Sequence, residues 1–124
     1  MKKRFCSLLL FCIVFTLSVA AQTEYYFYVQ FSDKNNSPYS LSNPSAYLSA
    51  RAIERRNAFG ISCDSTDLPV NPSYINQMSI PGIKLHLRSK WMNGVTVLVG
   101  DSSLMQQVRA LPFVKWVQYS GQLN

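Results

Sequence analysis

The sequence predicts an α+β domain with a ferredoxin-like, split βαβ order: a four-stranded antiparallel sheet with two helices on one face and one extra short helix. Three observations predict this fold. Four short segments are rich in aromatic and β-branched residues, amphipathic segments follow the first and the third of them, and an Asn-Gly pair separates the middle two. In such an order the first and third strands lie in the centre of the sheet, and the other two form its edges.

The first 21 residues have the pattern of a secretory signal peptide. Three basic residues at positions 2–4 precede an apolar run from Phe5 to Leu17, and small residues near its end favour cleavage after Ala21. The alternative is an uncleaved membrane anchor, which the shortness of the run disfavours. We therefore expect residues 22–124 to form one domain that is secreted or periplasmic and makes no membrane contact after cleavage.

The first half of this domain contains one predicted strand and one predicted helix. Glu24–Phe31 (EYYFYVQF) has strand composition, and residues 32–38 are rich in turn formers. An Asn-Pro pair at 43–44 is a typical helix start, so we expect a helix over residues 45–59 that ends at Gly60.

The second half supplies the remaining elements. A second Asn-Pro pair at 71–72 predicts a short helix through Ile80, and the alternation in residues 83–88 predicts a strand with one wet face. Asn93-Gly94 predicts a hairpin turn into a strand at Val95–Val99. A helix at 103–110, capped by Asp101 or Ser102 and ended by Pro112, then leads to a last strand at Phe113–Tyr119.

Composition argues against several classes of function. Of the 12 basic residues three lie in the leader, so nine remain against six acidic residues, and a net charge of +3 is too weak to favour nucleic acid. His86 is the single histidine, and after the leader is removed Cys63 is the single cysteine. No catalytic triad, zinc site or phosphate-binding loop can be built from this set, so we expect no enzyme activity, cofactor or metal.

Linked motifs in the last third of the chain carry a resemblance to a known family. Residues 87–97 (LRSKWMNGVTV) lead from one strand through Asn-Gly into the next, and a helix ending in proline then precedes Val114-Lys115-Trp116-Val117. This pattern resembles the N-terminal propeptides, or peptidase-inhibitor prodomains, of bacterial secreted subtilisin-like serine proteases. Residues 39–45, 52–56 and 67–71 are similar to one secreted branch of that family. The resemblance covers nearly all of residues 24–119.

The resemblance implies a folding assistant and cleft-blocking inhibitor, with the catalytic domain of a subtilisin-like protease as its partner. Family members are normally followed by that catalytic domain in the same chain. Because the sequence given ends at Asn124, we expect an isolated propeptide, a stand-alone inhibitor or a truncated precursor. The alternative function is that of a free-standing secreted ferredoxin-like module that binds a protein or peptide.

The resemblance also implies two contact regions: the sheet face opposite the helices and the C-terminal tail. We assign alternate residues of the first strand, from Tyr25 to Phe31, to the helix side, whereas the opposite registry would reverse the two faces. The expected protease-binding residues of the sheet face are then Tyr26, Tyr28, Thr96 and Leu98. The expected cleft-binding tail comprises Tyr119, Ser120, Gly121, Gln122, Leu123 and Asn124.

Overall fold

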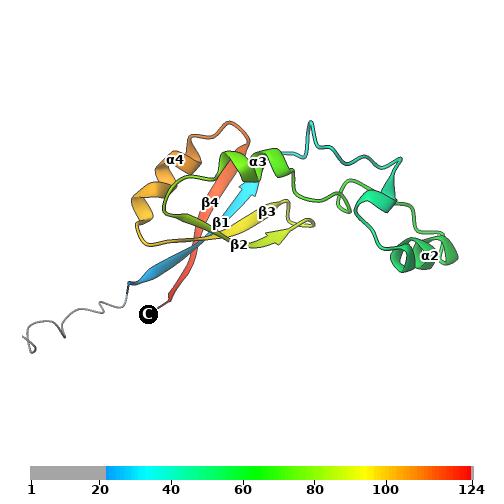
Figure 1. Cartoon of the computed structure of the whole chain (residues 1–124), viewed down its shortest axis with the longest axis horizontal. Helices are drawn as coiled ribbons and strands as arrows, with labels where there is room; N and C mark the ends of the chain where they lie inside the picture. Colours follow the sequence, from blue (N-terminus) through cyan, green and yellow to red (C-terminus); the bar gives the residue numbers. More distant parts are fainter. Residues whose placement is uncertain (1–21, 124) are drawn as a thin grey trace, which may run out of the picture.

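The computed structural model describes residues 22–123, in which a four-stranded antiparallel sheet carries helices α3 and α4 on one face (Figure 1). The predicted signal peptide and Asn124 lie outside the described residues. The strands are β1 (Glu24–Phe31), β2 (Ile83–Ser89), β3 (Gly94–Val99) and β4 (Val114–Leu123). Their spatial order is β2-β3-β1-β4, so the prediction that the first and third strands are central is confirmed.

The helices are short. A 3₁₀ turn, η1 (Pro44–Ala46), precedes α2 (Ala50–Ala58), α3 covers Pro72–Gln77, and η2 (Ser102–Leu104) continues into α4 (Met105–Arg109). The predicted caps of the later helices are confirmed, since Asn71 accepts from the amide of Ser73 at 2.9 Å and Asp101 accepts from that of Ser103 at 2.8 Å. No helix in residues 22–123 has the length and apolar character needed to cross a membrane.

The prediction of a single helix over residues 45–59 is wrong at its N-terminal end. Asn43 makes no capping bond to the backbone, and the chain forms only the turn η1 there. The α-helix begins later, where the Ser49 hydroxyl accepts from the amide of Ala52 at 3.2 Å. Ser49 therefore competes successfully with Asn43 as the N-cap.

We expected the helix at 45–59 to cover the sheet and the short helix at 72–80 to be the extra one, and this expectation is also corrected. Helix α2 has no buried residue and lies beyond the end of the sheet, whereas α3 packs on the core through Tyr74 and Ile75 (Figure 1). The difference follows from side-chain size. The stripe on α2 consists largely of alanine, and alanine offers too little apolar area to hold a helix against a sheet.

The core lies between the sheet and helices α3 and α4. The Tyr74 ring stacks on Phe113 at 4.2 Å between centroids, and Phe31 meets both rings edge-on at 5.6 Å. The β1 residues predicted to face the helices do so: Phe27, Val29 and Phe31 are buried, and Tyr25 packs against them. The other buried apolar residues are Val70, Met78, Val95, Val97, Val99, Met105 and Val108.

A bulge in β2 breaks the alternation that the sequence predicts there. Leu85 pairs with Val97, but Leu87 pairs with Thr96, so His86 is an extra residue in the strand. Leu87 is consequently on the same face as Thr96, away from the helices, and is 60% exposed. Arg88 pairs with Val95 and lies on the helix side, opposite to the predicted arrangement.

Candidate functional site

The sheet face opposite the helices gathers the four side chains predicted to bind a partner. On the two central strands Tyr26 pairs with Leu98 and Tyr28 pairs with Thr96, so the four residues are cross-strand neighbours. All four are partly exposed, and none belongs to the core. The registry chosen from the sequence is thus the one that the fold adopts.

Two aromatic neighbours on this face were missed by sequence reasoning. The Trp116 ring on β4 lies 5.2 Å from that of Tyr28, and the His86 ring on β2 lies 5.2 Å from that of Tyr26 in an edge-on contact. The position of Trp116 could have been predicted from the sequence. If Val117 faces the core, alternation places Trp116 on the opposite face.

We call this surface the outer face. It is broad, largely apolar and aromatic, and at one end it carries an exposed ion pair between Lys84 and Glu24 at 2.7 Å. Single exposed apolar side chains are normal on a protein, but a contiguous set of this kind is typical of a protein-binding surface. Its apolar, aromatic and hydroxyl-bearing members are Tyr26, Tyr28, His86, Leu87, Thr96, Leu98 and Trp116.

Tyr28 is held rigidly at the middle of the outer face. Its hydroxyl donates to the carbonyl oxygen of Met92 at 3.0 Å, and its ring extends over Gly94. A Cβ at position 94 would lie 2.5 Å from the Val29 carbonyl oxygen and would also meet the Tyr28 hydroxyl, so only glycine fits here. Partial burial raises the pKa of Tyr28 above its usual value.

The predicted tail is part of the sheet. The last strand was expected to end at Tyr119, but β4 continues to Leu123 and pairs with the start of β1, where Tyr26 faces Gly121 and Glu24 faces Leu123. No proline or charged residue interrupts the pairing. A bulge at Ser120 and the positive φ of Gly121, 146°, accommodate the change in register.

Because of the bulge, residues of the tail face different sides of the sheet. Tyr119 faces the helix side, where its ring meets Phe27 edge-on at 5.5 Å between centroids. Gly121 pairs with Tyr26 and lies on the outer face. The sixth predicted tail residue, Asn124, lies outside the described residues. The other edge of β4 has no neighbouring strand within residues 22–123.

The described part of the chain offers no grouping for metal binding. Within residues 22–123 no three side chains from His, Cys, Asp and Glu lie close enough together to hold a metal ion. His86 contacts an aromatic ring, and Cys63 is a free thiol in a loop. The outer face is therefore the candidate site that the described residues offer.

Comparison with known families gives a match over most of the chain. The model of the family described as the peptidase S8 propeptide domain of Bacteroidota matches residues 26–124. Searches of curated proteins and of solved structures returned no significant match.

Proposed function

Because the chain belongs to the peptidase S8 propeptide family of Bacteroidota, we propose that it assists the folding of a subtilisin-like catalytic domain and then inhibits it. A propeptide domain is not itself catalytic, and its partner is the catalytic domain of the protease. The observation that carries the proposal is the outer face, a rigid aromatic surface that the helices leave uncovered.

Binding to the outer face accounts for folding assistance without any chemistry in the prodomain. A domain that binds the native catalytic domain, and not its unfolded chain, stabilises the native state by mass action. Large aromatic side chains such as Tyr28 and Trp116 are common binding hot spots, because they bury much apolar area and lose little conformational entropy. The bond from Tyr28 to Met92 reduces that loss further.

Inhibition is assigned to the C-terminal part of β4 and the residue that follows it. The edge of β4 that faces away from β1 offers main-chain donors and acceptors to a strand of the substrate cleft, which is the mode called β-augmentation. In this proposal Tyr119 to Leu123 either present this edge while paired with β1 or leave β1 to lie in the cleft. Both routes place the end of the chain next to the catalytic centre.

Two further features belong to the same proposal. The strand order β2-β3-β1-β4 supports a ferredoxin-like topology, with α3 and α4 as the two covering helices and α2 as the addition. Residues 1–21 are assigned to a signal peptide that directs the domain out of the cytoplasm, as a partner of a secreted protease requires.

The test is inhibition of purified S8 catalytic domains from Bacteroidota by residues 22–124. We expect dose-dependent loss of peptidase activity, and faster recovery of activity when the denatured catalytic domain refolds with the prodomain present. The matched variants are Thr96→Arg, which places a charge on the outer face, and Gln106→Arg, which places one on the exposed side of α4. Equal inhibition by the two variants would contradict docking through the outer face.

A further inference from the structure

An arm formed by residues 36–71 extends beyond the sheet between β1 and α3. Figure 1 shows α2 in this arm at the end of the molecule opposite to the start of β1 and the end of β4. The arm contributes Val70 to the hydrophobic core, but its helix contributes no buried residue. The core therefore does not explain why α2 exists.

Local signals define both ends of α2. Ser49 caps its start, and Gly60 ends it with φ 63° in the left-handed region. The amide of Gly60 donates to Asn57 at 3.2 Å and that of Ile61 donates to Arg56 at 2.9 Å, which is the pattern of a Schellman cap. A nine-residue helix is nevertheless marginal in water without tertiary contacts. Other interactions must hold it.

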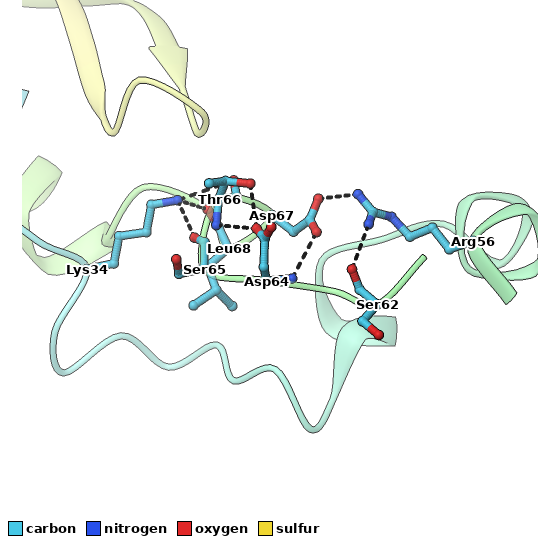
Figure 2. A network of polar contacts seen from close by, with 8 residues as sticks. All are labelled: Lys34, Arg56, Ser62, Asp64, Ser65, Thr66, Asp67 and Leu68. Atoms are coloured by element: carbon cyan, nitrogen blue, oxygen red, sulfur yellow. Dashed lines mark hydrogen bonds and ion pairs between the residues drawn. The ribbon is translucent and has the colours of Figure 1, made fainter. Parts of the chain in front are cut away.

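A polar hub supplies these interactions, and Figure 2 shows Lys34 at one end of it, the loop at 64–68 in the middle and Arg56 at the other end. The Lys34 ammonium donates to the carbonyl oxygens of Leu68 at 2.6 Å, Lys90 at 2.8 Å and Ser65 at 2.9 Å. The carbonyl oxygen of Thr66 is a fourth, longer contact at 3.4 Å, so four acceptors share the three hydrogens of the ammonium. One side chain thus joins the end of β1, the loop at 64–68 and the β2–β3 turn.

An ion pair connects the hub to α2. The Arg56 guanidinium contacts the Asp67 carboxylate, whose side chain is 3% exposed, and Arg56 also donates to the Ser62 carbonyl oxygen at 3.3 Å. The second carboxylate oxygen of Asp67 accepts from the Asp64 amide at 3.2 Å. Hydrogen bonds from a charged and a neutral donor to a buried carboxylate are strong and directional. The ion pair therefore fixes the orientation of α2 relative to the loop at 64–68.

The same hub reaches the outer face through the β2–β3 turn, residues 90–93. Lys34 bonds the carbonyl oxygen of Lys90, and Tyr28 bonds that of Met92. Trp91 and Met92 in this turn are 72% and 56% exposed. A continuous series of contacts therefore runs from the outer face through an exposed apolar turn to the arm.

The arm presents apolar and basic side chains to solvent. Phe59 and Ile61, on either side of Gly60, are 72% and 55% exposed. Arg51 and Arg55, one helical turn apart, are exposed, and the two ion pairs within residues 22–123 involve other residues. Apolar residues flanked by unpaired cations are complementary to an apolar patch with an acidic rim.

We propose that residues 36–71 form a rigid docking arm, which binds an apolar patch with an acidic rim on the same catalytic domain that covers the outer face. The proposal rests on the proposed function, since it takes that catalytic domain as the partner. Phe59 and Ile61 make the apolar contact, Arg51 and Arg55 steer association, and Lys34 is a positioning residue that holds the arm at its docking angle.

The test uses residues 22–124 and the S8 catalytic domain that they inhibit most strongly. We expect the double variant Phe59→Ser/Ile61→Ser to raise the inhibition constant by at least ~10-fold, and Arg51→Glu/Arg55→Glu to slow association mainly at low salt. Gln106→Ser on α4 is the exposed control and should match the unmodified domain. The thermal unfolding of each variant shows whether its fold is retained.

Lys34→Met separates positioning from contact. We expect weaker inhibition and faster amide hydrogen exchange in residues 50–61, with unchanged exchange in β1. When Lys34→Met is combined with Phe59→Ser/Ile61→Ser, it should have little further effect on inhibition, because the arm contacts are already lost. If Phe59→Ser/Ile61→Ser inhibits as strongly as the unmodified domain, the proposal of a docking arm is wrong. If Thr96→Arg loses inhibition in the same experiment, the proposed function remains intact. Failure of the unmodified domain to bind any S8 catalytic domain would overturn both.

Discussion

The ring of Trp116 lies 5.2 Å from the ring of Tyr28, so the edge strand β4 and the central strand β1 share one aromatic pair on the outer face. Trp116 is 37% exposed and does not belong to the core on the other face. If the outer face docks on the catalytic domain, Trp116→Ala should weaken inhibition by about 10-fold or more, since buried aromatic anchors dominate interface energies.

The accompanying loss in the free energy of unfolding should be ~1 kcal/mol, because the variant removes one aromatic pair at the surface. Inhibition assays and urea unfolding of the same preparation measure the two effects. A large loss of stability with an unchanged inhibition constant would assign Trp116 to folding instead of docking.

Gly94 should be the glycine least tolerant of substitution. In Gly94→Ala the new Cβ would lie 2.5 Å from the Val29 carbonyl oxygen, which is backbone and cannot move aside cheaply. We expect a loss of ~1–3 kcal/mol in the free energy of unfolding, as for other overpacked sites. Gly100→Ala is the matched control, because no atom lies within 4 Å of its added Cβ and its φ is not positive. Similar denaturant midpoints for the two variants would refute this account of the turn.

Tyr74 should contribute a pH-dependent part of the stability. Its hydroxyl donates to Asp33 at 2.6 Å, and this bond together with the Asn35 amide holds the pKa of Asp33 below its usual value. A carboxyl group with a lowered folded-state pKa stabilises the fold above its unfolded pKa, and the contribution disappears as the pH falls through the folded value.

Tyr74→Phe keeps the stack on Phe113 and removes this bond. We expect it to cost ~1 kcal/mol at pH 7 and less as the pH falls below the ordinary pKa of a carboxyl group. Thermal unfolding from pH 7 to pH 3 provides the measurement. A cost that does not change with pH would show that the carboxylate is not the partner that matters.

The features that the sequence predicted correctly depend on local patterns. The bounds of β1 follow from one dense run of aromatic and β-branched residues, and the two faces of β1 follow from alternation. The cap at Asn71 could be predicted because it depends on a few neighbouring residues, and the order of the strands could be predicted from the split βαβ order of the elements along the chain. The outer-face residues Tyr26 and Tyr28 were found in this way.

The features that were missed depend on which distant segments meet. The bulge at His86 turns Leu87 outward, and no residue pattern within β2 predicts this bulge. The end of β4 depends on the length of β1 beside it. Lys34 binds carbonyl oxygens of residues 31 to 56 positions away. Since every residue has a carbonyl group, the sequence gives no sign of which ones will converge on an ammonium group.

The C-terminal end of β4 provides the last prediction. Removal of residues 121–124 takes away the β4 partners of Glu24, Tyr25 and Tyr26, but it retains the pairing of Phe27 with Tyr119 above the core. We therefore expect the truncated domain to fold, with its melting temperature lowered by several degrees for the loss of roughly 1 kcal/mol of strand contacts. Its inhibition constant should rise by at least ~10-fold, because a folded domain holds the start of the tail at high effective concentration near the cleft.

Substitution of Leu123 by Ser in the full-length domain serves as the control for side-chain loss, since it keeps the main-chain bonds that β-augmentation uses. It should inhibit nearly as well as the unmodified domain. If the truncated and full-length domains have equal inhibition constants, the end of β4 does not reach the cleft, and inhibition would have to come from docking of the outer face and the arm.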